Sequence, residues 1–149
     1  SGIEGDDTDG HVDDLTRFVA TNTLVTVVED DASDVNEKRL RENLRRLRAA
    51  RRLDGGSFEV VPLPMPEVIR SSGGLRCPAS YANFFLANRL ALVPTFGSRT
   101  DSRALSILRE LLPGRDVMGV PSQDLVAGRG SVHCLTQQEP ANSTFGHSE

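Results

Sequence analysis

The stretch Leu24-Val25-Thr26-Val27-Val28 decides the fold that the sequence predicts for this 149-residue chain. It is aliphatic and β-branched almost throughout, which is typical of a strand that is buried on both faces. Residues 14–20 predict a second strand, and the polar linker Thr21-Asn22-Thr23 connects the two. We therefore expect this strand pair to organise the first part of the fold.

A helix and a third strand are expected after the pair. Asp34 is expected to cap the helix, with Glu37 three residues later completing a start that resembles a capping box. From Leu40 onward, leucines recur at the spacing i, i+4, i+7, which predicts an amphipathic helix that ends at about Arg52. Residues 58–63 then predict a strand, because they are mostly apolar and prolines follow them.

The second half of the chain repeats this order. Residues 81–88 and 90–95 predict two strands joined by a tight turn. Asp101 is expected to cap the helix that follows, residues 116–120 predict its closing strand, and residues 121–127 predict a turn. Strand, strand, helix, strand therefore occurs twice. Such repetition indicates an α/β fold of modular units that cannot bury their apolar faces alone.

Composition bounds the class of protein. With 38% hydrophobic and 26% charged residues, the chain suits one domain with a real core. The net charge of −4 argues against a nucleic-acid partner, so the dense basic face at residues 38–52 is interpreted as solvated. No apolar run reaches the roughly 18 residues of a membrane span, and no signal peptide is recognised. We expect a soluble, cytoplasmic protein without a membrane partner, in which Cys77 and Cys134 are free thiols.

Near the C-terminus, a glycine-punctuated loop leads into a segment of strand-like composition that contains Cys134, in the stretch Gly128-Arg129-Gly130-Ser131-Val132-His133-Cys134-Leu135-Thr136-Gln137-Gln138. This thiol is the candidate nucleophile. If residues 131–136 are extended, His133 and Cys134 point to opposite faces, so His133 is a poor base for its neighbour. The expected partner is His11, which lies in Asp9-Gly10-His11-Val12-Asp13.

Other interpretations of these residues are weaker. Zinc binding by His133, Cys134 and His11 is disfavoured, because adjacent strand residues diverge and no second cysteine pair has zinc spacing. Asn83 is expected to be a structural hydrogen-bonding residue. The glycine loop lacks the Gly-Lys-Ser/Thr ending of a phosphate-binding loop. We therefore expect neither a metal nor an organic cofactor.

Four motifs, in this order and spacing, resemble the agmatine deiminases and the related bacterial peptidyl-arginine deiminases. They are Gly10-His11-Val12-Asp13, Pro78-Ala79-Ser80-Tyr81-Ala82-Asn83-Phe84, Val93-Pro94-Thr95-Phe96 and His133-Cys134-Leu135-Thr136-Gln137-Gln138. The resemblance covers residues 4–141. It implies a partial pentein, an α/β-propeller of which this chain would supply about two of five ββαβ units.

On this resemblance, residues 1–149 are a single fragment of a catalytic domain, resembling its C-terminal two fifths. Its units would span roughly residues 10–66 and 79–138, and residues 139–149 would form a flexible tail. The implied partners are the missing N-terminal half or another copy of the chain. The sequence leaves open whether the shortness is natural.

The resemblance implies hydrolysis of a guanidinium to a ureido group and ammonia, as in agmatine conversion to N-carbamoylputrescine during putrescine biosynthesis. It assigns Cys134 as nucleophile, through a thiouronium intermediate, and His11 as general acid/base. It assigns Asp13 as the carboxylate that grips the guanidinium, and places Gly130 in the substrate site. This chemistry suits the residue types, since a thiolate must attack a cation that carboxylates hold. In an extended chain, His11 and Asp13 would share one face.

The chain also departs from the family pattern. Arg129 stands where a glycine is expected, so its side chain could block a site or demand a different backbone angle, and Asp14 stands where Asn is common. The segments that carry a second substrate carboxylate in relatives are absent from this sequence. Agmatine and peptidyl-arginine both remain open as substrates. The alternative is a catalytically idle fragment that associates through exposed strand edges.

Overall fold

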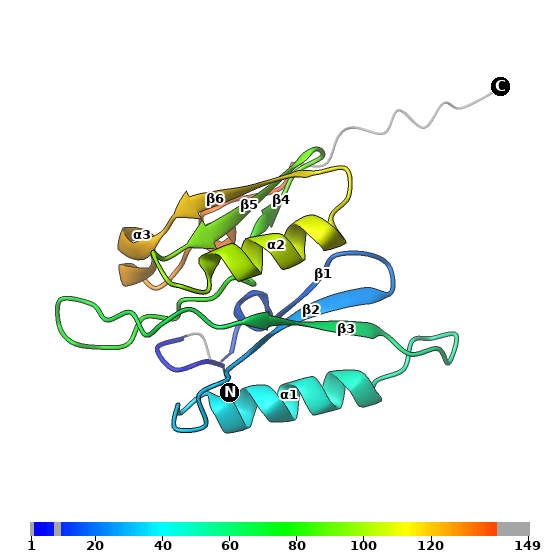
Figure 1. Cartoon of the computed structure of the whole chain (residues 1–149), viewed down its shortest axis with the longest axis horizontal. Coiled ribbons are helices and arrows are strands. Elements are labelled where there is room, and N and C mark those ends of the chain that lie inside the picture. Colours follow the sequence, from blue (N-terminus) through cyan, green and yellow to red (C-terminus); the bar gives the residue numbers. More distant parts are fainter. Residues whose placement is uncertain (1, 8–9, 140–149) are drawn as a thin grey trace.

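The computed structural model describes residues 2–7 and 10–139, which form two three-stranded sheets and their connecting helices (Figure 1). The first half contains η1 (Val12–Asp14), β1 (Thr16–Phe18), β2 (Thr23–Val28), α1 (Glu37–Ala49) and β3 (Glu59–Pro64). The second half contains β4 (Phe85–Leu86), β5 (Leu90–Thr95), α2 (Asp101–Leu111), β6 (Asp116–Pro121), α3 (Gln123–Ala127) and η2 (His133–Leu135).

Both sheets have the same topology. In each, the first strand pairs antiparallel with the middle strand, and the third strand pairs parallel on its other side, in the orders β1-β2-β3 and β4-β5-β6. A helix makes each parallel crossover, as parallel pairing requires. The predicted order of strand, strand, helix, strand is therefore confirmed in both halves.

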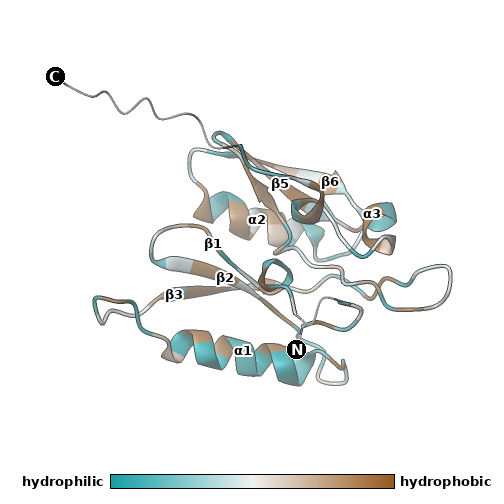
Figure 2. Ribbon diagram, turned by 180° about the vertical axis from the view of Figure 1, so that it is seen from behind, coloured by the Kyte–Doolittle hydropathy of each residue, from teal (hydrophilic) through white to brown (hydrophobic). Residues whose placement is uncertain are grey.

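The helices occupy different layers. Helix α2 lies between the two sheets and contacts β6 and β3, whereas α1 covers the outer side of the first sheet (Figures 1 and 2). The core is aliphatic and aromatic, and it includes fully buried side chains from both halves, among them Val25, Leu63, Phe84, Val93 and Leu108. The second sheet and α2 thus bury apolar area against the first unit.

The first strand of each unit is shorter than predicted. The strand expected at residues 14–20 is only β1, and the one expected at residues 81–88 is only β4. The residues before them leave the strand ladder because their side chains enter a buried polar cluster. Asp14 and Asn83 both belong to that cluster and are 7% and 1% exposed. These early positions therefore form a site instead of extending the sheets.

Helix α1 begins later and ends earlier than predicted. Asn36, not Asp34, is its N-terminal flanking residue, and the helix stops at Ala49 instead of about Arg52. The Asp34 carboxylate accepts a hydrogen bond from the Asn36 main-chain N–H and pairs with Arg76 at 2.8 Å. Both side chains of this ion pair are 9% exposed. The ion pair with Arg76, which lies in the linker between the units, therefore holds Asp34 in place of a helix-capping contact.

The residues predicted as a turn at 121–127 include the short helix α3. The start of α2 shows the same effect as the start of α1. Asp101 is the first residue of α2, and Thr100 flanks it. The Asp101 carboxylate accepts from the Tyr81 hydroxyl at 2.6 Å and from the Phe96 main-chain N–H at 3.1 Å. Tertiary contacts again use the residue that the local pattern assigned to capping.

The surface of α1 fits the solvated interpretation of its basic face. Lys38, Arg41 and Arg48 are exposed, and Glu42 pairs with Arg45 and Arg46. Within the part of the chain that the structure describes, no helix has both the length and the apolar stretch needed to cross a bilayer. The flexible tail predicted at residues 139–149 lies outside the described residues, except for its first residue.

Candidate active site

Three segments that are far apart in the sequence meet at one site. Asp14 ends η1 two residues before Thr16, the first paired residue of β1. Asn83 stands two residues before Phe85, the first paired residue of β4. The third segment is η2, which contains Cys134. Each unit therefore presents the segment before its first strand to the cysteine turn.

The prediction of an extended segment at residues 131–136 is wrong, because the chain forms the 3-10 turn η2 there. The Asn83 carboxamide oxygen accepts from the main-chain N–H groups of His133, at 3.0 Å, and Cys134, at 3.4 Å, which curls the chain around it. His133 and Cys134 consequently do not diverge. Both reach Asp13.

Asp13 is the residue on which the side chains converge. Its Oδ2 atom lies 2.8 Å from His133 Nδ1, 3.7 Å from the Cys134 sulfur and 3.0 Å from Asn83 Nδ2. The expectation that His11 and Asp13 share a face of an extended chain is wrong, because η1 begins immediately after His11. The site nevertheless places the Cys134 thiol beside the Asp13 carboxylate, and the His133 imidazole is hydrogen-bonded to the same carboxylate oxygen.

Burial and charge set the ionisation of the two adjacent carboxyls in opposite directions. Burial alone would raise the pKa of Asp13, but its hydrogen bond and charge interaction with His133 hold it below its usual value. Burial, together with the charges of Asp13 and Asp6, raises the pKa of Asp14 to about 7, against an opposing hydrogen bond from Asn83. Asp13 is therefore the fixed anion of the site, while Asp14 changes charge near neutral pH.

The resting state of Cys134 follows from the same cluster. Partial burial of the sulfur raises the pKa of Cys134, hydrogen bonds from Asn83 and the Ser131 main chain lower it, and the charges of Asp13 and Asp14 raise it again. The net shift is upward. The thiol form of Cys134 is therefore favoured over the thiolate at neutral pH.

Arg17 supplies a partly buried positive charge that sequence reasoning missed. Its guanidinium donates to the Phe84 carbonyl at 2.8 Å and lies 4.8 Å from the centre of the Phe84 ring. Burial lowers the pKa of Arg17, while the charges of Asp13, Asp14 and Cys134 raise it. Arg17 stands on β1, one residue after Thr16, and no motif around it distinguished it from a surface arginine.

Gly130 and His11 occupy the positions that adjoin this cluster. A Cβ atom on Gly130 would lie 2.9 Å from the Cys134 Cβ, so the turn that presents the thiol requires a glycine there. The His11 side chain is exposed, and its main-chain N–H donates to Asp6 at 3.2 Å. Contact between the His11 ring and the Cys134 sulfur stays a prediction.

Arg129 resolves the departure noted in the sequence. Its φ of 68° is left-handed, which is the backbone angle that a glycine would adopt without strain. The side chain pairs with Asp7 at 2.8 Å, and both side chains are half exposed. The chain thus keeps the glycine-like turn and carries the arginine toward the N-terminal loop.

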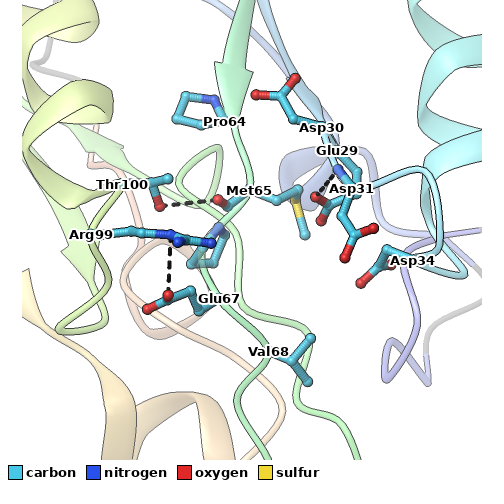
Figure 3. Close-up of a pocket in the computed structure, with 11 residues that line it drawn as sticks. Glu29, Asp30, Asp31, Asp34, Pro64, Met65, Glu67, Val68, Arg99 and Thr100 are labelled. Carbon is cyan, nitrogen blue, oxygen red and sulfur yellow. Dashed lines mark hydrogen bonds and ion pairs between the residues drawn. The ribbon is translucent and has the colours of Figure 1, made fainter.

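An acidic pocket of about 330 Å³ lies elsewhere, beside the end of β3 (Figure 3). Thr100 donates to the Met65 carbonyl at 3.0 Å, and Arg99 pairs with Glu67 at 3.2 Å in this pocket. Its lining includes none of the predicted site residues. Among residues 2–7 and 10–139, no group of three or more His, Cys, Asp or Glu is arranged to hold a metal ion.

Comparison with known proteins identifies the family. The family described as Porphyromonas-type peptidyl-arginine deiminase matches residues 1–140. The chain belongs to this family. The agmatine deiminase of Stutzerimonas stutzeri (strain A1501) is 34% identical over an alignment of 157 residues. The alignment covers 94% of this chain and 43% of the relative.

Solved structures agree with this family assignment. A provisionally named arginine deiminase from Porphyromonas gingivalis has a TM-score of 0.91 and 45% identity, covering 95% of this chain and 41% of that one. The agmatine deiminase of Enterococcus faecalis has a TM-score of 0.82 and 29% identity, covering 89% and 41%. The chain spans about two fifths of the length of the relatives it matches. Its fold is that of a part of these deiminases.

Proposed function

We propose that this chain carries the nucleophile side of an active site that hydrolyses a guanidinium group to a ureido group and ammonia. The observation that carries the proposal is the Cys134 sulfur, 3.7 Å from Asp13 Oδ2 on a turn that a glycine makes possible. A thiol beside a fixed anion suits a cationic, planar electrophile, because the carboxylate binds the cation that the sulfur attacks.

In the proposed reaction, the Cys134 thiolate adds to the central guanidinium carbon and forms a tetrahedral species. His11, as imidazolium, gives a proton to the departing nitrogen, so ammonia leaves and an S-alkylthiouronium remains. Neutral His11 then takes a proton from water, whose oxygen adds to the same carbon. Collapse of that adduct breaks the C–S bond and releases the ureido product. Asp13 and Gly130 line the substrate position.

The electrostatics of the site favour a cationic substrate. Asp13, together with Asp14 once it is ionised, raises the pKa of Cys134, so the empty site suppresses the thiolate. A bound guanidinium would offset those charges and lower the pKa of the thiol at the moment of attack. The proposed cycle is thus triggered by its own substrate and needs no cofactor.

We further propose that residues 10–66 and 79–138 are two ββαβ units of a five-unit pentein ring. The remaining units, from the rest of a longer chain or from a second copy, would supply another carboxylate. Agmatine, on a route to putrescine in the cytoplasm, is the favoured substrate, and a protein arginine side chain is the alternative. The relatives named as agmatine deiminases support the first.

Covalent labelling tests the proposal on the chain itself. Chloroacetamidine is a planar cation, and chloroacetamide is its neutral counterpart, so the ratio of their alkylation rates at Cys134 measures cation recognition. We expect the amidine to react at least about tenfold faster, and D13N to remove that preference, because one ion pair at a partly buried site contributes about 1.4 kcal/mol. Peptide mass spectrometry separates Cys134 from the buried Cys77.

Equal rates for the two reagents in the unmodified chain would contradict guanidinium recognition. Incubation with agmatine and colorimetric detection of ureido product gives the second measurement. We expect little turnover by this chain alone, since the second carboxylate is absent, and C134A should abolish what remains. C77A is the matched cysteine control. Robust turnover would contradict the proposal that other units complete the site.

A second candidate function is association, and the first unit supplies the observation that favours it. β1 is an edge strand, and the side chains of Val12 and Phe18 are 68% and 56% exposed. They border a largely apolar groove of about 670 Å³ that Leu47 and Phe58 also line. Sedimentation over a range of concentrations tests this function, because a strictly monomeric chain at every concentration would contradict it.

A further inference from the structure

Asn83 is buried where the cysteine turn meets the two acidic residues, and it was expected to be merely structural. Its carboxamide oxygen accepts hydrogen bonds from Ser131 Oγ at 2.9 Å and from the main-chain N–H groups of His133 and Cys134 at 3.0 and 3.4 Å. A main-chain N–H can only donate, so these contacts determine which end of the amide is oxygen. The amino group must therefore face the acidic side.

The amino group of Asn83 meets more acceptors than it can serve. Its nitrogen lies 3.0 Å from Asp13 Oδ2, 3.0 Å from Asp14 Oδ1 and 3.2 Å from the Cys134 sulfur. A carboxamide carries two N–H hydrogens, so at most two of these three acceptors receive a well-directed bond at one time. The sulfur and the two carboxylates consequently compete for the same donors.

We infer that Asn83 is a positioning residue for the Cys134 sulfur, and that Asp14 restrains the thiol by competing for the amide hydrogens of Asn83. The inference rests on the proposed function only in taking Cys134 as the nucleophile. An N–H that points at a sulfur favours the thiolate over the thiol. A carboxylate is a stronger acceptor than a neutral carbonyl, so ionised Asp14 takes a larger share of the donors.

The position of Asp14 makes this competition specific. Asp14 and Asn83 come from the segments that precede β1 and β4, and their side chains contact each other. Asp14 is held there, since its main-chain carbonyl accepts from Ser80 Oγ at 2.7 Å. Charged and titratable groups also face the cluster from η1, β1, the cysteine turn and the N-terminal loop, namely Asp13, Arg17, His133 and Asp6. Substitution at Asn83 or Asp14 leaves these four side chains in the sequence, although N83A also removes a hydrogen bond to Asp13 and D14N removes a charge that acts on Arg17.

Alkylation of Cys134 by iodoacetamide, followed by peptide mapping from about pH 6 to about pH 11, tests the inference. N83A removes the donor to the sulfur. We expect it to move the midpoint up by about one pH unit and to slow alkylation about tenfold below the midpoint. D14N keeps the shape and an acceptor oxygen but removes the charge. It is expected to move the midpoint down and to speed alkylation several-fold.

S131A is the matched control, because it removes one contact to the Asn83 oxygen and leaves the amino group in place. Its midpoint should equal that of the unmodified chain. A purely structural role for Asn83 predicts that N83A loosens the turn without raising the midpoint. A D14N midpoint that is not lowered contradicts restraint of the thiol by Asp14, whose charge also raises the pKa of Cys134 directly. Either result would overturn the inference.

D14N keeps the inference testable if N83A does not fold. Thermal unfolding of each variant identifies such a failure. Because iodoacetamide is neutral and reports on the thiol alone, these outcomes are independent of guanidinium turnover. Failure of the amidine preference would remove the proposed function and leave the alkylation result standing.

Discussion

Helix α2 packs between the two sheets, whereas α1, its counterpart in the first unit, covers only the outer side of one sheet (Figure 1). The difference is visible at equivalent positions. Leu108 and Leu44 are each the eighth residue of their helices, and Leu108 is fully buried while Leu44 is only partly buried. Two units with one topology therefore differ in how deeply their helices are buried, according to what covers them.

The same contrast extends to the site. The first unit contributes an acid, Asp14, and the second an amide, Asn83, each from the segment before its first strand. One changes charge near neutral pH, and the other keeps a fixed set of donors and acceptors. Two units with the same topology thus contribute different chemistry to one site.

The largest expected loss of stability tests the difference in burial between the two helices. L108A should lower the free energy of unfolding by about 4 kcal/mol, because it leaves a cavity between two sheets that cannot collapse onto it. L44A at the equivalent place should cost about 1 kcal/mol, since solvent already reaches that side chain. Urea unfolding of both variants measures the difference, and equal losses would show that the two helices are equally supported.

The next effect concerns the pH dependence that distinguishes Asp14 from Asn83. The pKa of Asp14 is raised from 3.8 to about 7 in the folded chain. Between these two pH values the folded chain therefore keeps a proton on Asp14 that the unfolded chain has lost. The free energy of unfolding should therefore fall as pH rises from about 4 to about 7, by up to about 4 kcal/mol.

D14N removes this penalty. Relative to the unmodified chain, D14N should be stabilised progressively as pH rises through that window, with no such gain below about pH 4. Urea unfolding across the pH range measures it. The exposed D124N variant is the control and should show no comparable trend. A constant difference between D14N and the parent at every pH would refute the prediction.

A smaller effect compares how the two helix starts are anchored. R76M leaves the buried Asp34 carboxylate without its ion-pair partner and should cost about 3 kcal/mol. Y81F removes one hydroxyl hydrogen bond to the Asp101 carboxylate and should cost about 2 kcal/mol. Chemical denaturation ranks the two, and a larger loss in Y81F would mean that the second anchor is the stronger one.

The smallest expected effect is at the open face of the first unit. F18S should change the free energy of unfolding by less than about 0.5 kcal/mol, because Phe18 is 56% exposed and contributes little burial within one chain. If this face mediates association, the same variant should weaken self-association in sedimentation. A stability loss comparable to that of L44A would instead place Phe18 in the core of the isolated unit.

The sequence by itself determined the two copies of strand, strand, helix, strand, the buried run at β2 and the family, because periodicity, turn residues and motif spacing are local signals. It also singled out Cys134 and Asp13, and it raised the question of backbone angle at Arg129. Its errors concern residues whose local signal competed with a distant contact. Asp34 and Asp101 looked like helix caps, yet Asp34 bonds Arg76 from the linker between the units, and Asp101 bonds Tyr81 near the start of the second unit.

Only the tertiary structure decided the shape of the site. The sequence treated residues 131–136 as extended and sent His133 away from Cys134, whereas Asn83, about fifty positions earlier, binds that turn and brings both residues to Asp13. No local pattern encodes the partners of a buried amide. Such a side chain must satisfy its donors and acceptors wherever the fold places them, and that requirement, more than strand propensity, bends the cysteine segment.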